Sequence, residues 1–397
     1  MKRPQMGQIA TDRVLFEQKW EGSDDLFSQR INILKLICTV GIVCMHTSYL
    51  SVPVGDGDMM VRSMDWLVFV RLLRVAMRVC VPTFFLLSGY LFVMHSAGDE
   101  RFGSVEWYKG KFKRRVRSLM VPYLVSNIVV YLCFNIGNLL MQDLMKSGNS
   151  YCVYSSWTDY VLMFWTPANS VMWFLRDLII VSFLTPIILP LLKWSRGVLL
   201  VLFGVLWYTD IWVTDYSGFS SVSFFFFYLG AWMGMNHGSN GLERIIGQPR
   251  ARLCRFHSYS GERISRITRI GRNMVCLLAV CCWWYCAMIS HTLRSDHTFI
   301  PLGMVLLFTM VNKLDERHLR AIDGKFWMPA CVLIYAYHSM IQIPMKKGLY
   351  VLIRPENPLW NYAIYFSTVA FTVLFLAGVY WLMKRLMPRY TWLFTGR

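Results

Sequence analysis

A lysine and a histidine interrupt the first long apolar stretch of the chain, residues 31–50. In a helix, the eleven residues from Lys35 to His46 turn the chain by roughly 1100°, within about 20° of whole turns, and advance it by about 16 Å. The two side chains therefore share one face. A neutral imidazole in a dry site can take a proton from a hydroxyl and return it to a leaving group. Lys35 alone has a second interpretation, in which its ammonium group extends to the lipid headgroups.

Further ionisable side chains lie in or beside other apolar segments, where such groups are costly and often functional. The adjacent Arg176 and Asp177 either compensate each other in a buried network or hold a sugar hydroxyl or an acyl carbonyl. His338 lies about 18 Å along its segment, at a depth similar to that of His46, and is either a hydrogen-bonded structural histidine or part of the site. The candidates for an acceptor or oxyanion site are Arg78, Arg176, Asp177 and His338.

A cluster of lysines and arginines precedes the apolar segment 119–141. Arg114 and Arg117 are three residues apart, so on a helix they would point the same way. Arginine binds phosphate groups through two parallel hydrogen bonds, and coenzyme A carries phosphates. The alternative is a charge cluster that only orients the protein in the membrane, which is the better interpretation for the neighbouring lysines.

Several catalytic patterns are missing or weak. Ser88, in Ser-Gly-Tyr, lacks a G-x-S-x-G elbow, so close helix packing at Gly89 explains the motif better. The pair His291 and Asp296 has the spacing of glycerolipid acyltransferases, but it lies in a short loop on the predicted outer face. No nucleotide-binding loop and no zinc spacing occurs, so we expect neither a metal nor a bound cofactor. The cysteines, mostly within apolar runs, are interpreted as buried small side chains.

Ten apolar segments are long enough to cross a membrane, some of them only marginally. The stretch Met64–Arg78 carries Arg71, Arg74 and Arg78 on one face and is predicted to lie along the interface. The ten segments are 31–50, 79–95, 119–141, 171–192, 197–214, 219–236, 273–290, 298–312, 327–345 and 361–383.

The net charge of +18 arises from 41 Lys and Arg against 23 Asp and Glu. With ten spans and an internal N-terminus, thirty of these cations fall on the inner side and ten on the outer side. Lys and Arg accumulate on the cytoplasmic side of membrane proteins, so both termini are predicted to be cytoplasmic. The positive charge is therefore interpreted as membrane topology and contact with anionic lipids, not as nucleic-acid binding.

The composition supports a membrane protein, with 55% hydrophobic and 16% charged residues and a mean hydropathy of +0.40. A soluble domain has nearer one-quarter charged residues, and the abundant aromatic residues exclude disorder. We therefore predict an all-α polytopic membrane protein. It comprises a cytoplasmic segment 1–30, a membrane domain 31–386 and a cytoplasmic tail 387–397.

Several motifs together resemble the acyltransferase family 3 membrane proteins. Lys35-x10-His46 is similar to the family's R/K-x10-H signature on the first span, and Val81–Phe92 resembles its apolar run ending in Phe-Phe and Ser-Gly-Tyr. Each motif alone is weak, but their order along the chain is specific. The others are Arg114-x-x-Arg117 before Val-Pro-Tyr (121–123), Trp173–Leu178, Phe227–Ala231 and Ile334–His338.

The resemblance implies transfer of an acyl group, commonly acetyl from acetyl-coenzyme A, to a hydroxyl of a cell-envelope saccharide or related acceptor. It implies a bacterial plasma-membrane enzyme in which His46 is the catalytic base. Lys35, Arg114 and Arg117 would then handle the anionic donor. A transporter or flippase of an envelope precursor remains the alternative, because intramembrane charges and ten spans serve transport as well.

Overall fold

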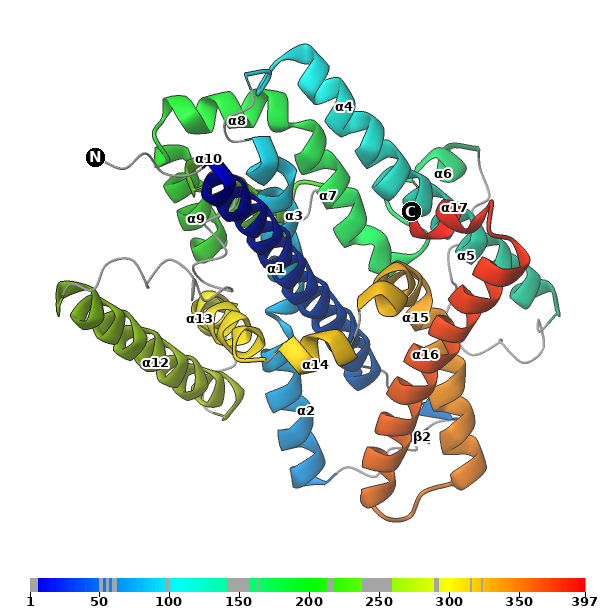
Figure 1. Ribbon diagram of the computed structural model, residues 1–397. Helices are drawn as coiled ribbons and strands as arrows, with labels where there is room; N and C mark the ends of the chain where they lie inside the picture. The colour runs from blue at the N-terminus through cyan, green and yellow to red at the C-terminus, as the bar shows by residue number, and fades with distance from the viewer. Residues whose placement is uncertain are drawn as a thin grey trace.

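The computed structural model describes residues 6–49, 53–54, 57–58, 63–96, 100–140, 157–162, 164–212, 218–237, 259–288, 293–314, 316–322 and 324–396. These residues are almost all helical (Figure 1), which confirms the all-α prediction. Strands β1 (Pro53–Val54) and β2 (Gly57–Asp58) form a two-residue antiparallel pair. The α-helices are α1 (Met6–Tyr49), α2 (Met64–Met77), α3 (Cys80–Val93), α4 (Val105–Arg115), α5 (Val121–Leu140), α6 (Trp157–Leu162), α7 (Trp173–Phe183), α8 (Thr185–Trp194), α9 (Val198–Thr209), α10 (Ser221–His237), α12 (Tyr259–Met288), α13 (Leu293–Asn312), α14 (Glu316–Ala321), α15 (Gly324–Ile353), α16 (Leu359–Leu386) and α17 (Thr391–Thr395).

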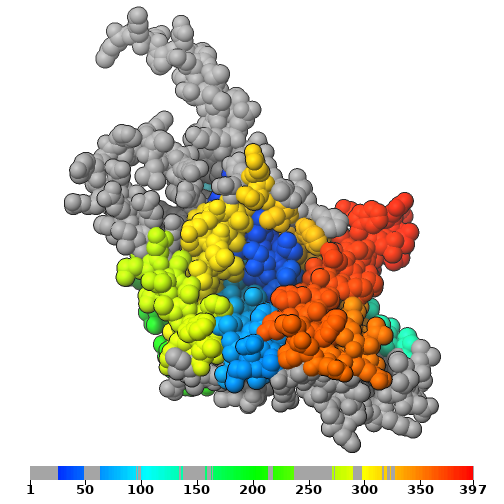
Figure 2. Space-filling model, turned by 90° about the horizontal axis from the view of Figure 1, so that it is seen from below, coloured from blue at the N-terminus to red at the C-terminus, as the bar shows by residue number. Residues whose placement is uncertain are grey.

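Helix α1 lies at the centre of the bundle. It packs against α2, α3, α15 and α16, and its buried side chains include Leu34, Cys38 and Ile42. In the space-filling view, α1 appears as a blue patch between α2, α13 and the C-terminal helices (Figure 2). Because other helices enclose α1 so widely, a polar side chain on it faces protein more readily than lipid.

Among the described residues, four helical stretches are long and apolar enough to cross a membrane: Leu26–Ser48, Met64–Val93, Val105–Cys133 and Leu359–Leu386. Three shorter apolar helices, Val198–Thr209, Asn273–Met288 and His297–Asn312, accompany them. A bundle of such helices is a membrane protein, because in lipid a helix satisfies its own backbone hydrogen bonds. The count of ten crossings stays a prediction.

The stretch Met64–Arg78 differs from its prediction as an interfacial helix. α2 is followed directly by α3, and together they form a 30-residue apolar stretch, Met64–Val93. Arg74 donates from Nη2 to the Ser48 carbonyl oxygen at 2.7 Å and from Nε to Ser48 Oγ at 3.2 Å. The sequence alone does not show whether an arginine such as Arg74 contacts a neighbouring helix or lipid headgroups.

The predicted span 171–192 is bent in the middle. α7 ends at Phe183, α8 begins at Thr185, and the two axes differ by 63°. Pro186, in the first turn of α8, has no N–H group to donate to the Ser182 carbonyl oxygen, which instead accepts a hydrogen bond from Thr185 Oγ1 at 2.7 Å. The proline therefore accounts for the break.

Helices α3 and α10 cross with their backbones in direct contact. A Cβ atom on Gly89 would lie 1.9 Å from the Phe227 carbonyl oxygen, and one on Gly230 would lie 2.0 Å from the Leu86 carbonyl oxygen. Both lengths are far below a van der Waals contact, so only glycine fits at this crossing. Small residues allow this approach between membrane helices. The interpretation of Ser-Gly-Tyr as a packing motif is confirmed.

We expect Gly230→Ala to destabilise the bundle, because the added methyl group must separate α10 from the α3 backbone. Overpacking of this kind costs on the order of 1–3 kcal/mol. The measurement is the thermal unfolding midpoint of the detergent-purified protein. Gly378→Ala in α16 is the control, since a Cβ there meets no heavy atom within 4 Å. Equal midpoints in the two variants would contradict the prediction.

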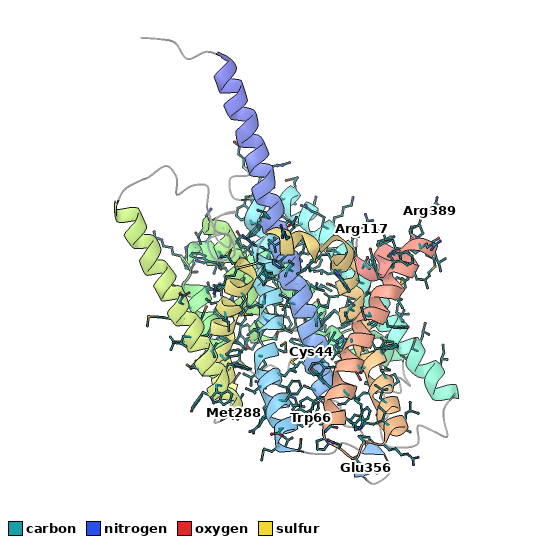
Figure 3. All side chains as sticks on the ribbon, turned by 60° about the horizontal axis from the view of Figure 1, so that its bottom comes forward. Cys44, Trp66, Arg117, Met288, Glu356 and Arg389 are labelled. Atoms are coloured by element: carbon teal, nitrogen blue, oxygen red, sulfur yellow. The ribbon has the colours of Figure 1, made fainter. Side chains whose placement is uncertain are left out.

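The two ends of the bundle are distinguished in Figure 3. The N-terminal part of α1, Arg117 and Arg389 lie at one end, whereas Trp66, Met288 and Glu356 lie at the other. The N-terminal part of α1 and Arg389, near the C-terminus, thus lie at the same end of the bundle, as an even number of membrane crossings requires. Cys44, two residues before His46, lies closer to the second end. His46 is therefore remote from the end that carries Arg117.

Candidate active site

His46 and His338 meet inside the bundle. His46 comes from the last turns of α1 and His338 from the middle of α15, and these two helices pack against each other. The ring centroids are 5.0 Å apart and the ring planes are inclined by 58°. His46 is half-buried, whereas His338 is fully buried. The pair therefore combines one partly exposed ring with one fully buried ring.

The hydrogen bonding of His338 defines its tautomer. Its Nδ1 lies 2.8 Å from the Tyr335 carbonyl oxygen. A carbonyl oxygen can only accept, so Nδ1 carries the hydrogen, and in a neutral ring Nε2 is then an acceptor. This buried Nε2 has no hydrogen-bond partner among the described residues. Buried polar atoms are nearly always satisfied, and an unsatisfied acceptor beside a second histidine is an arrangement suited to proton transfer.

Lys35 lies on α1 eleven residues before His46, in the N-terminal half of the apolar stretch Leu26–Ser48. Its side chain is half-buried and interacts with other residues, and its carbonyl oxygen accepts a hydrogen bond from Thr39 Oγ1 at 2.8 Å. Arg78 is the C-cap residue of α2, at the junction with α3, and is also half-buried. The rival residue His291 lies outside the described residues.

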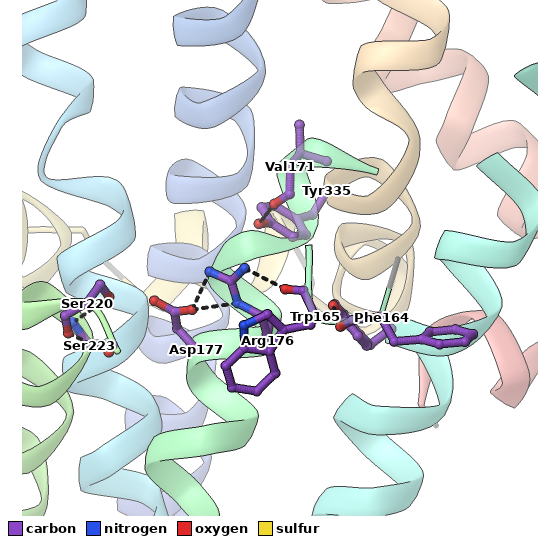
Figure 4. A network of polar contacts seen from close by, with 9 residues as sticks. Phe164, Trp165, Val171, Arg176, Asp177, Ser220, Ser223 and Tyr335 are labelled. Atoms are coloured by element: carbon purple, nitrogen blue, oxygen red, sulfur yellow. Dashed lines mark hydrogen bonds and ion pairs between the residues drawn. The ribbon is translucent and has the colours of Figure 1, made fainter. Parts of the chain in front are cut away.

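Arg176 and Asp177 form a buried ion pair (Figure 4). Arg176 donates to Asp177 Oδ1 from both Nε, at 3.0 Å, and Nη2, at 2.9 Å. Its Nη1 donates to the Trp165 carbonyl oxygen at 2.9 Å. The side chain of Asp177 is 1% exposed and that of Arg176 is 11% exposed. The two residues therefore do compensate each other, as one of the sequence interpretations requires.

Tyr335 connects this ion pair with the histidines. Its ring centroid is 6.2 Å from that of His338, and its hydroxyl donates to the Val171 carbonyl oxygen just before α7. Its ring also lies 5.6 Å, centroid to centroid, from Phe174 in the first turn of α7. Through Tyr335, the histidine pair is thus linked to the start of α7, the helix that carries Arg176 and Asp177.

The arginines before α5 are arranged differently from a simple helix. Arg114 is exposed, with Nε 3.3 Å from the Gly110 carbonyl oxygen, and Arg117 is exposed above the Trp392 ring at 5.1 Å. Arg115 instead points inward and donates to Ser88 Oγ at 3.0 Å and to the Ser88 carbonyl oxygen at 3.1 Å. A π-helical turn, Val116–Met120, begins after Arg115 and contains Arg117, so Arg114 and Arg117 do not belong to one regular α-helix.

Sequence reasoning missed a set of uncharged polar residues next to the histidine pair. Asn169 donates from Nδ2 to the Ala336 carbonyl oxygen at 2.6 Å and to Ser126 Oγ at 3.0 Å. Its backbone N–H donates to Asn127 Oδ1 at 3.1 Å. All three side chains are buried. The available signal is the amide group itself within an apolar segment.

The structure also places two overlooked residues against the last turns of α1. Gln342 and Lys346 follow His338 on α15 at intervals of four residues, and both side chains are buried. Within the described part of the chain, no group of three or more His, Cys, Asp or Glu side chains could hold a metal ion.

Comparison with known proteins gives one match. The model of the acyltransferase 3 family, described as an acyltransferase domain, matches residues 28–381. No curated protein and no solved structure matches the chain. The matched range includes both histidines, the Arg176–Asp177 pair and the arginines before α5.

Proposed function

The chain belongs to the acyltransferase 3 family, and on this premise we propose that it transfers an acyl group, acetyl in the simplest case, from acyl-coenzyme A to a hydroxyl of a cell-envelope saccharide or related acceptor. The protein is a membrane acyltransferase; donor, acceptor and catalytic base are the proposal. The observation that carries it is the His46–His338 pair, 5.0 Å between ring centroids, inside the bundle.

In this proposal His46 is the general base. It takes the proton of the acceptor hydroxyl while the oxygen attacks the thioester carbonyl carbon. When the carbon–sulfur bond breaks, the protonated imidazole returns the proton to the coenzyme A sulfur. His338 supports this role because its Nδ1 is committed to the Tyr335 carbonyl oxygen and its neutral ring adds no positive charge beside His46. A cation in the polar interior would stabilise the oxyanion.

The donor would enter from the end of the bundle that carries Arg117, which we assign to the cytoplasm. Arg114 and Arg117 are exposed there, so their guanidinium groups are accessible to phosphate. Lys35 lies on α1 between this end and His46. The acceptor would approach from the opposite end, toward Arg176 and Asp177. The bacterial plasma membrane is the location that this arrangement suits.

We expect Arg114→Ala and Arg117→Ala each to raise the KM for acyl-coenzyme A roughly ten- to hundred-fold, because each loses a charge-assisted bond of about 1.5–3 kcal/mol. Arg385→Ala is a matched control: Arg385 is exposed and stacks on Trp381 at 5.8 Å, much as Arg117 stacks on Trp392. Steady-state kinetics with varied donor provide the measurement. A donor KM equal to that of the control would leave both arginines with a purely topological role.

The test of the function is incubation of the purified protein with labelled acetyl-coenzyme A and a hydroxylated acceptor. Release of free coenzyme A with label on the acceptor supports the proposal, and comparing the masses of envelope glycans from deletion and wild-type cells identifies acceptor and acyl group. A transporter is the second candidate, favoured only by the 63° break between α7 and α8, since transporters use interrupted helices. It predicts no consumption of the donor.

A further inference from the structure

The last turns of α1, which carry His46, are held by side chains from other helices. Gln342 of α15 donates from Nε2 to the Val43 carbonyl oxygen at 2.8 Å and to Thr47 Oγ1 at 2.6 Å. These two acceptors lie three residues before and one residue after His46. Gln342 is 1% exposed, so the contact is fully internal. A single amide group thus contacts the backbone before the imidazole and the side-chain hydroxyl of the residue after it.

Lys346 adds a cation at the same place. Its Nζ donates to the Thr47 carbonyl oxygen at 3.1 Å, and the side chain is only 1% exposed. The last four carbonyl groups of a helix have no partner within the helix, and the helix dipole makes this end negative. Since α1 ends at Tyr49, Thr47 is one of these last residues. The buried ammonium group therefore satisfies an acceptor that would otherwise be unpaired in an apolar environment.

His338, Gln342 and Lys346 share one face of α15, because side chains four residues apart in a helix project in the same direction. The face of α15 that places His338 beside the His46 ring is thus the face that donates hydrogen bonds to the backbone around His46. Helix ends fray when tertiary contacts do not hold them. The position of an imidazole three residues from the end of α1 depends on such contacts.

Two further donors complete the set from other directions. Arg74 of α2 donates to the Ser48 carbonyl oxygen at 2.7 Å, and the Tyr365 hydroxyl of α16 donates to the Cys44 carbonyl oxygen at 2.9 Å. Three helices, α2, α15 and α16, therefore donate hydrogen bonds to carbonyl groups on both sides of His46, those of residues 43, 44, 47 and 48. A helix packed only through apolar side chains would not need four polar donors directed at one turn.

We propose that Gln342 and Lys346 are positioning residues for His46, and that they set the rotation and depth of the last turn of α1 against α15. The inference rests on the proposed function only in taking His46 as the reacting group. A misplacement of about 1 Å at a reacting group can lower a rate by two orders of magnitude. Loss of either contact should therefore slow the chemical step without changing how the donor binds.

The test compares Gln342→Leu and Lys346→Met with Tyr350→Phe. The Tyr350 hydroxyl is a matched control: it is buried on α15 one turn beyond Lys346, and it donates to Asn361 Oδ1 of α16 at 2.6 Å. We expect kcat per folded molecule to fall at least tenfold in the first two variants, with an unchanged donor KM. The control should stay within about twofold of wild type. Lys346→Arg should recover most of the loss, because it keeps a cationic donor.

A second readout follows the position of His46 without catalysis. Diethyl pyrocarbonate modifies accessible imidazoles, and mass spectrometry measures its rate at the His46 peptide. This rate should rise several-fold in Gln342→Leu and Lys346→Met but not in Tyr350→Phe. Thr47→Val removes only the hydroxyl that Gln342 contacts, so it gives a milder change if the larger substitutions fail to fold.

The two proposals fail in different ways. If kcat and the modification rate of His46 in Gln342→Leu, Lys346→Met and Thr47→Val match those of Tyr350→Phe, the positioning role is wrong while the acyl-transfer function stands. If His46→Ala itself retains turnover, the role of His46 as base is wrong. The modification rate still reports whether the two residues hold this turn.

Discussion

His46→Ala is expected to abolish acyl transfer while the protein still inserts and folds. A positioned general base contributes about 10²–10⁴-fold to a rate, so the loss should greatly exceed that of a packing defect. The imidazole is half-buried and lies 5.0 Å, centroid to centroid, from His338. It is therefore partly exposed, and it lies beside His338, whose Nδ1 hydrogen is donated to the Tyr335 carbonyl oxygen. The measurement is turnover per mole of monodisperse protein with labelled acyl-coenzyme A.

Lys35→Arg is the control for this experiment. It preserves the cation on α1, and the sequence signature of the family accepts either residue, so much of the activity should remain. A structural role for His46 predicts the reverse pattern, with low expression of His46→Ala and near-normal activity per folded molecule. Activity of His46→Ala within about tenfold of wild type would remove His46 from the role of base.

Arg176→Met is expected to be among the most destabilising single substitutions in the chain. It leaves the Asp177 carboxylate, 1% exposed, without the guanidinium group that gives it two hydrogen bonds. Breaking a buried ion pair from one side costs about 3–5 kcal/mol. The thermal unfolding midpoint and the yield of monodisperse protein measure the effect. Asp210→Asn is the control, since Asp210 is 41% exposed and 3.8 Å from His297 Nε2, and exposed pairs contribute about 1 kcal/mol at most.

The double variant Arg176→Met with Asp177→Leu separates the two interpretations of this pair. Replacing a buried ion pair by apolar side chains of similar size is often neutral for stability, so the unfolding midpoint should return toward wild type. If the pair also holds the acceptor, the KM for acceptor should still rise about ten- to hundred-fold, reflecting a lost charge-assisted bond. Normal acceptor kinetics in a stable double variant would assign the pair to structure alone.

The arginines before α5 show what spacing alone leaves open, because Arg114 and Arg117 are both exposed and the arginine between them, Arg115, points inward. Residues three apart share a face in an α-helix, and this spacing predicts that Arg114 and Arg117 act as a pair. In the structure Arg114 lies in the last turn of α4 and Arg117 lies in the π-helical turn Val116–Met120, whereas Arg115 points inward to Ser88. The sequence contains three arginines within four positions, and nothing in it indicates which of them points inward. Only the neighbouring end of α3 decides that.

The periodicity of apolar residues and the cost of burying charge determined most of the architecture from the sequence. These two effects are local: they established an all-helical membrane domain, a histidine inside its first span and the close packing at Gly89. They could not show that α2 continues toward α3. An arginine such as Arg74, which donates to the end of α1, produces the same sequence pattern as an arginine that contacts lipid headgroups.

The tertiary structure decided which polar groups meet. His46 and His338 are 292 positions apart in the chain, and depth along two separate helices was the only property that the sequence assigned to both. Their contact depends on how α15 is rotated against α1 and α7. The same rotation decides the hydrogen bond from Tyr335 to Val171 and the hydrogen bonds from Gln342 and Lys346 to α1. That rotation is set by the packing of many apolar side chains at once, and no single segment encodes it.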